Sequence, residues 1–201
     1  PRMPPRIVVR TAGLLLFLGS HSLRLCAPAW RERQLQRLGD KTWKGLYSLV
    51  SIAGFGLLVW GYGQLHTQLA PLFLLPEGAA RGLRHLVALL VLPAFWLMVA
   101  AYVPRNHLKA ALKHPMTLSV KLWALAHLLV NHTAADLLLF GGLLLWSVLL
   151  FRNARRRPAP AVAPGSWPGT LAVLVLGTGA YAVFAMVLHV RWIGVAPFLQ
   201  G

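Results

Sequence analysis

Long apolar runs separated by short basic segments constrain this chain more than any other feature. Six such runs cover residues 7–25, 46–63, 85–103, 116–130, 134–151 and 170–190. All but the fourth, which is shorter, approach the ~20 residues that a helix needs to cross ~30 Å of hydrocarbon. Because lipid offers the backbone no hydrogen-bond partner, such runs fold as helices. The sequence therefore predicts an all-α, polytopic transmembrane bundle of about six spans.

The composition agrees with a membrane protein and argues against a nucleic-acid-binding one. The chain is 57% hydrophobic and 12% charged, with 20 Lys and Arg against 4 Asp and Glu, whereas soluble domains carry about 25% charged residues. In a soluble protein the basic excess would suggest nucleic acid, but no loop interleaves a long basic face with base-stacking aromatics. We expect the lipid bilayer as the partner and no nucleic acid. With Cys26 as the single cysteine, no internal disulfide can form.

The loops divide the chain and orient it. We predict a five-span domain over residues 1–151, a basic, Pro- and Ala-rich linker over 152–169 and a last span within 170–201. Residues 31–44 are typical of an amphipathic interfacial helix, and 64–82 of a surface linker. Most Lys and Arg follow the first, third and fifth spans, which places these loops in the cytoplasm and both termini outside. The N-terminal Arg2, Arg6 and Arg10 oppose this orientation.

Histidines inside the apolar runs are the candidates for a cofactor site. Ionisable side chains at membrane depth are functional hypotheses by default, and His21 and His127 are embedded deepest. Two imidazoles on facing helices can ligate a haem iron through Nε2. The alternative for each is a structural hydrogen bond, for His21 to Ser20 or Ser22.

The other polar side chains near the spans are explained more simply by structural roles. Lys121 is expected to extend its ammonium to the cytoplasmic face. His132 is expected to bond Asp136 four residues later on one helix face; a proton relay or a haem-propionate neighbour is the alternative for this pair. Arg105 at a span end could bind a haem propionate or anchor the topology. Arg24 and His85 complete the set of candidate cofactor-binding residues.

Several sequence motifs resemble the NnrU family. They are GSHSLR at 19–24, WKGLYSLVS at 43–51, YVPRNHLK at 102–109, KHPM at 113–116, KLWALAHLL at 121–129 and ADLLLFG at 135–141. The resemblance implies a multi-pass protein of the bacterial inner membrane, linked to denitrification and nitric oxide. Nitrogen-oxide respiratory proteins are then possible partners.

The resemblance also extends to the haem b-containing zeta-carotene isomerases, which are relatives of the family. Their haem-ligating histidines lie in motifs that fall on His21 and His127 here, which implies a haem b ligated by these two residues. The first motif here is tighter than that of the isomerases, and this departure puts isomerase activity in doubt.

Two other functions stay open. The chain could be a non-catalytic membrane accessory or assembly factor with structural histidines. Residues 113–117 (KHPMT) also resemble the Arg-His-Pro-x-Tyr motif of membrane methyltransferases that use S-adenosylmethionine. Lys and Thr replace the Arg and Tyr of that motif, and the expected paired glutamates are missing, since the chain has only Glu32 and Glu77.

Overall fold

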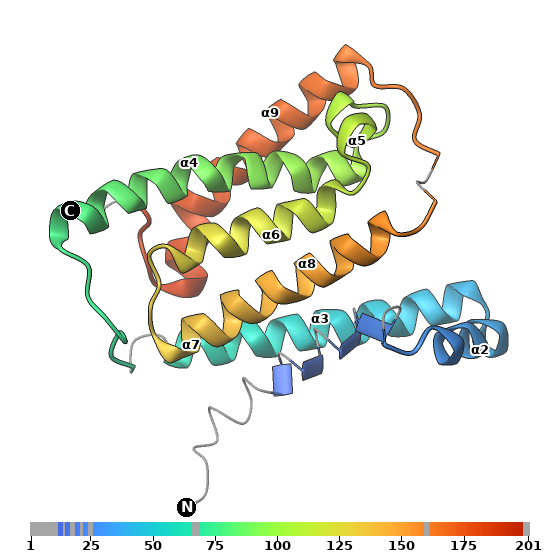
Figure 1. Cartoon of the computed structure of the whole chain (residues 1–201), viewed down its shortest axis with the longest axis horizontal. Helices are drawn as coiled ribbons and strands as arrows, with labels where there is room; N and C mark the ends of the chain where they lie inside the picture. Colours follow the sequence, from blue (N-terminus) through green and yellow to red (C-terminus); the bar gives the residue numbers. More distant parts are fainter. Residues whose placement is uncertain are drawn as a thin grey trace, which may run out of the picture. The chain divides into compact units, whose positions relative to one another are not determined.

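The computed structural model describes residues 12–13, 15–16, 19–20, 22–23, 26–65, 69–158 and 161–198, and in this part of the chain every regular element is a helix. The chain forms two compact units, residues 1–69 and 70–201 (Figure 1). Four helical segments are long and apolar enough to cross a membrane: Asp40–Trp60, Glu77–Tyr102, Ala134–Arg155 and Trp167–Ile193. The predicted all-α, multi-pass membrane protein is confirmed.

Unit 1 contains helices α2 (Pro28–Leu38) and α3 (Asp40–Leu65). The interfacial helix predicted over 31–44 is divided at Gly39, whose φ of 77° is a conformation that glycine adopts without steric penalty. Residues 40–44 therefore begin α3 instead. Trp30 and Trp43 pack edge to face across this turn, with ring centroids 6.0 Å apart.

The described residues of the first predicted span pack along α3 in an antiparallel register. A Cβ on Gly13 would lie 2.6 Å from the backbone nitrogen of Leu58, so only glycine fits there. Seven residues later, the hydroxyls of Ser20 and Ser51 lie 3.3 Å apart. Small residues that let helix backbones approach are typical of membrane helix pairs.

Unit 2 begins with α4 (Glu77–Tyr102), the short α5 (His107–Leu112) and α6 (Pro115–Leu128). A continuous helix follows: α7 (Ala134–Asp136), a π-helical segment η1 (Leu137–Gly141) and α8 (Gly142–Arg155). The last helix joins α9 (Trp167–Val183) to a second π-helical segment, η2 (Phe184–Ile193). The predicted linker over 64–82 is shorter than expected, because Pro76 is the extended residue after which α4 starts.

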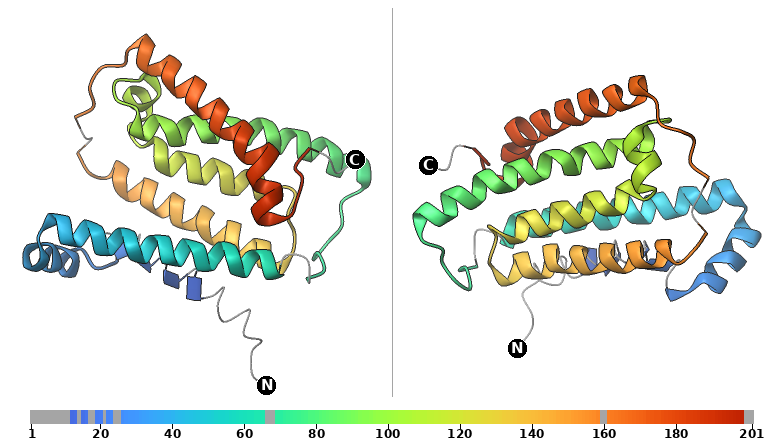
Figure 2. Two further views of the ribbon diagram at one scale, coloured as in Figure 1. Left: turned by 180° about the vertical axis from the view of Figure 1, so that it is seen from behind. Right: turned by 45° about the horizontal axis from the view of Figure 1, so that its top comes forward.

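Helix α6 lies between α4 and α8, while α9 packs against α4 (Figure 1, Figure 2). The contacts use small side chains, and Ala94, Ala100, Ala124 and Ala126 are buried. At 14 residues, α6 is roughly 21 Å long, which explains why the predicted fourth span is not among the four long ones. The division into residues 1–151, 152–169 and 170–201 stays a prediction.

Asn106 joins α4 to α5 within the segment YVPRNHLK. Its side-chain oxygen accepts a hydrogen bond from the Lys109 backbone at 2.8 Å and caps α5. Its amide nitrogen donates to the carbonyls of Ala100 and Val103 at 3.0 and 2.7 Å. One buried side chain therefore satisfies the end of one helix and the start of the next.

The last helix is attached to the same junction. Ser166 donates through its backbone nitrogen (2.7 Å) and its hydroxyl (2.8 Å) to the carbonyl of Arg105. The hydroxyl of Thr170 donates to the Ser166 carbonyl, so it accepts from both the backbone nitrogen and Nδ1 of His107, at 3.0 and 2.7 Å. These bonds position the start of α9 beside α5.

Two glycines of α9 provide a matched test of the contact between α4 and α9. A Cβ on Gly177 would lie 2.6 Å from Cδ1 and 3.1 Å from Cα of Trp96, whereas a Cβ on Gly179 would meet nothing within 4 Å. Trp96 is also held by its hydrogen bond to Thr178 at 2.9 Å. We expect Gly177→Ala to reduce stability by about 1–3 kcal/mol, despite the better helix propensity of alanine.

Gly179→Ala should leave stability unchanged or raise it by up to about 1 kcal/mol. Thermal unfolding of both purified variants in one detergent measures the difference. Equal midpoints for the two variants would contradict the tight contact at Trp96.

Candidate functional site

His127 lies in the last turn of α6 with its ring held in one orientation. Its Nδ1 lies 2.8 Å from the carbonyl oxygen of Trp123, one turn earlier. Because a carbonyl can only accept, Nδ1 carries the proton and donates it. In the neutral ring Nε2 then holds a lone pair, and the hydrogen bonds of the described residues include none to this atom. This is the tautomer that a metal-ligating histidine needs.

Two aromatic side chains that also contact each other lie on adjacent sides of this imidazole. The Phe140 ring stacks on it with centroids 4.9 Å apart and an interplanar angle of 26°. Trp123 lies 4.4 Å away at 39° and also contacts Phe140 edge to face at 5.2 Å. The three rings form what we call the His127 cluster, in which aromatic contacts and the hydrogen bond to Trp123 orient the imidazole.

The register of α4 and α6 gives the depth of His127. The hydroxyl of Ser119 donates to the carbonyl of Ala94 at 2.6 Å, and the two helices run antiparallel. Counting the same number of residues onward from Ser119 along α6 and back from Ala94 along α4 puts His127 level with Leu86. Leu86 lies roughly 14 Å along the helix axis from Glu77, the first residue of α4. His127 therefore lies within the length of the α4 span, although it is close to the end of its own short helix.

The other predicted cofactor residues are placed differently. His85 is level with His127 on the neighbouring helix, but its side chain is exposed, while the His127 ring packs on η1 at the other side of α6. Arg105 is exposed beyond the far end of α4, roughly 25 Å of helix from His85. His21 and Arg24 lie outside the described residues. The role of all four stays a prediction.

A second histidine shares the hydrogen-bonding state of His127. Nδ1 of the half-buried His189 donates to the carbonyl of Val195 at 2.8 Å, which leaves its Nε2 with the lone pair. Both histidines are associated with π-helical segments, because Phe140 belongs to η1 and His189 to η2. Such segments are often found at functional sites. The i→i+5 hydrogen bonds of a π-helix leave no signal in the periodicity of a uniformly apolar sequence. The sequence therefore does not predict these two segments.

The predicted pair of His132 and Asp136 is wrong. Helix α7 begins at Ala134, so His132 precedes the helix and does not share a face with Asp136. Asp136, only 1% exposed, accepts hydrogen bonds from the backbone nitrogen and hydroxyl of Thr133 at 2.9 and 2.7 Å. The His132 ring instead stacks on Phe73 with centroids 4.1 Å apart.

Comparison with protein families settles the membership of this chain. The family model described as NnrU protein matches residues 9–197, nearly the whole length. The chain belongs to the NnrU family. No curated protein and no solved structure matched it.

Two of the NnrU-like motifs meet at the His127 cluster. KLWALAHLL supplies Trp123 and His127 from α6, and ADLLLFG supplies Phe140 from η1. Among the described residues, no group of three or more His, Cys, Asp or Glu side chains could hold a metal ion. In this NnrU protein the His127 imidazole lies against two aromatic rings, and the lone pair of its neutral ring is on Nε2.

The cap beside the His127 cluster gives a test of local stability. Thr133 and Asp136 form a capping box, in which the Asp136 backbone nitrogen also donates to the Thr133 hydroxyl at 3.1 Å. We expect Thr133→Ala to lower the free energy of unfolding by about 1–2 kcal/mol. Thr133→Ser keeps the hydroxyl and should behave like the natural protein. Unfolding of the purified protein in detergent, followed by circular dichroism, checks both; identical curves for the two variants would refute the role of the cap.

Proposed function

We infer that this NnrU-family membrane protein binds haem b through His127 and His21 and acts in a redox or nitric-oxide-linked role. The state of His127 is the observation that carries the proposal. Its Nδ1 proton is committed to the Trp123 carbonyl, and Nε2 presents a lone pair in an aromatic setting. A neutral imidazole in this state could hold the iron of a haem.

The chain's own residues would perform three tasks in such a site. The Trp123 carbonyl fixes the orientation of the imidazole and makes it a better donor to iron. Phe140 and Trp123 keep water away from the ring. A bound haem would supply one-electron chemistry and affinity for diatomic nitrogen oxides.

The family supports the biological setting of the proposal. The similarity of this chain to NnrU-type proteins implies that the protein lies in the bacterial inner membrane and functions in denitrification. Nitrogen-oxide respiratory proteins would then be its partners. The concentration of Lys and Arg in the loops around α5 and after α8 supports a cytoplasmic location for these loops. Both termini would then be periplasmic.

Absorption spectra of single-histidine variants test haem binding. After haem-replete expression, we expect the purified natural protein to show a Soret band and the α and β bands of a low-spin haem when reduced. His127→Ala and His21→Ala should each lose most of the haem or shift it to a high-spin spectrum, because one axial ligand is removed. The haem-to-protein ratio from pyridine haemochrome measurements quantifies the loss.

His114→Ala is the matched control, because His114 lies at the opposite end of α6 from His127 and should leave the spectrum unchanged. A spectrum lost in His127→Ala and His189→Ala but kept in His21→Ala would identify His189 as the second ligand and reject His21. A protein without a Soret band that still supports its partners would favour the accessory-factor function.

A further inference from the structure

An open pocket of about 210 Å³ lies where α4 ends, α5 turns and α6 begins. Its lining includes Ala101 from the last turn of α4, Lys109 and Lys113 around α5, and Met116 and Thr117 from the first turn of α6. We call it the basic pocket. It lies at the end of unit 2 that is remote from the His127 cluster, because His127 is in the last turn of α6.

Two lysines that line the basic pocket can donate hydrogen bonds to a ligand. The Lys109 ammonium donates to the Ala101 carbonyl at 2.7 Å, which holds it in place and leaves two of its three protons for other acceptors. The Lys113 side chain is exposed at the rim. The Thr117 hydroxyl donates to the His114 carbonyl at 3.0 Å, so its oxygen can also accept.

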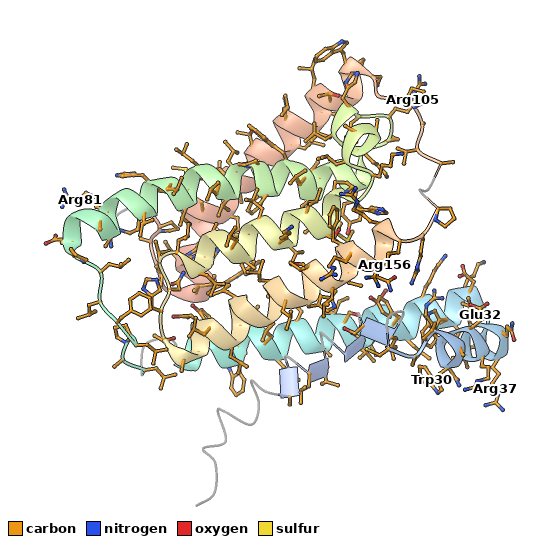
Figure 3. All side chains as sticks on the ribbon, in the orientation of Figure 1. Trp30, Glu32, Arg37, Arg81, Arg105 and Arg156 are labelled. Carbon is orange, nitrogen blue, oxygen red and sulfur yellow. The ribbon has the colours of Figure 1, made fainter. Side chains whose placement is uncertain are left out.

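Within unit 2, the charge around the basic pocket is positive, and the carboxylates of this unit lie elsewhere. In unit 2 the acidic residues are Glu77 and Asp136, which lie in the first turns of α4 and α7, at the opposite end. Lys121 and Arg155 lie over the Phe151 ring at 5.5 and 5.8 Å on the side of α8. Arg105 and Arg156 lie at this end and Arg81 at the other (Figure 3).

The position of the basic pocket along α4 indicates which class of anion would bind there. The α4 span ends at Tyr102, so Ala101 lies in the last turn of that span, where a membrane helix approaches the headgroups. Two apolar side chains beside the pocket, Leu112 and Met116, are each 42% exposed and can contact acyl chains. Basic pockets between membrane helices on the cytoplasmic side bind anionic headgroups.

We propose that the basic pocket binds the phosphate of an anionic phospholipid, with Lys109 and Lys113 as its cationic partners. The lipid phosphate provides the negative charge that no carboxylate of unit 2 provides at this end. The acyl chains of the lipid lie along the exposed apolar side chains. This site is independent of haem, and its test does not need a cofactor.

Native mass spectrometry of the full-length protein in an uncharged detergent tests the proposal. Dioleoyl phosphatidylglycerol and dioleoyl phosphatidylcholine are titrated separately. We expect the natural protein to bind the first lipid more tightly than the second, and Lys113→Gln to weaken that binding about fivefold to tenfold. Lys113→Arg should restore it, because the charge returns.

Arg157→Gln is the matched control. It removes the same charge from the same end of unit 2, but its exposed side chain is outside the lining of the pocket. Equal weakening in Lys113→Gln and Arg157→Gln would overturn the proposal in favour of general surface attraction. Equal affinity of the natural protein for the two lipids would also overturn it.

Competition with inorganic phosphate distinguishes a lipid headgroup from a free phosphate ion as the ligand of the pocket. We expect millimolar phosphate, at constant ionic strength, to leave the binding of phosphatidylglycerol nearly unchanged, because the acyl chains contribute to lipid affinity. Complete displacement of the lipid by phosphate, with phosphate binding lost in Lys113→Gln, would assign the pocket to a free phosphate and overturn the lipid.

Discussion

The absence of water around the spans is the constraint on which the rest of this structure depends. Each buried polar group must find its partner inside the protein, because an unpaired one would cost several kcal/mol in hydrocarbon. Asn106 meets this requirement by bonding both α4 and α5. Tyr181 meets it from α9, donating its hydroxyl to the Ala88 carbonyl of α4 at 3.1 Å. The same bonds that satisfy polar groups therefore also fix which helices are neighbours.

Because of this constraint, the two ends of unit 2 also differ in their chemistry. At one end the Lys109 ammonium is held at the Ala101 carbonyl and the Lys113 side chain is exposed, so both line a pocket that an anion can enter. At the other end the His127 ring contacts Trp123 and Phe140 and donates through Nδ1, which leaves the lone pair of the neutral ring on Nε2. The proposed lipid site and the proposed haem ligand therefore lie at opposite ends of unit 2.

The sequence predicted the fold well because apolar length is a strong signal, and it predicted the local geometry less well. Helix ends depended on single residues, Gly39 and Pro76, whose effects shift boundaries by several positions. The pairing of His132 with Asp136 failed because spacing of four residues matters only inside a helix, and Thr133 caps the helix between them. His127 could be selected from its depth, whereas its contact with Phe140 needed the packing of α6 on η1, which no local pattern encodes.

The packing of the short α6 explains how the His127 ring comes to lie against η1. Buried Ala124 and Ala126 let the neighbouring helices approach closely, so the ring of residue 127 meets η1 instead of lipid. The π-helical turn of η1 changes the direction of the side chains that follow it, relative to a regular helix, and Phe140 stacks flat on the imidazole. Because the ring is oriented before any ligand arrives, little conformational entropy is lost on binding. Rigid placement of one imidazole is what a ligation site requires and what a merely buried histidine does not need.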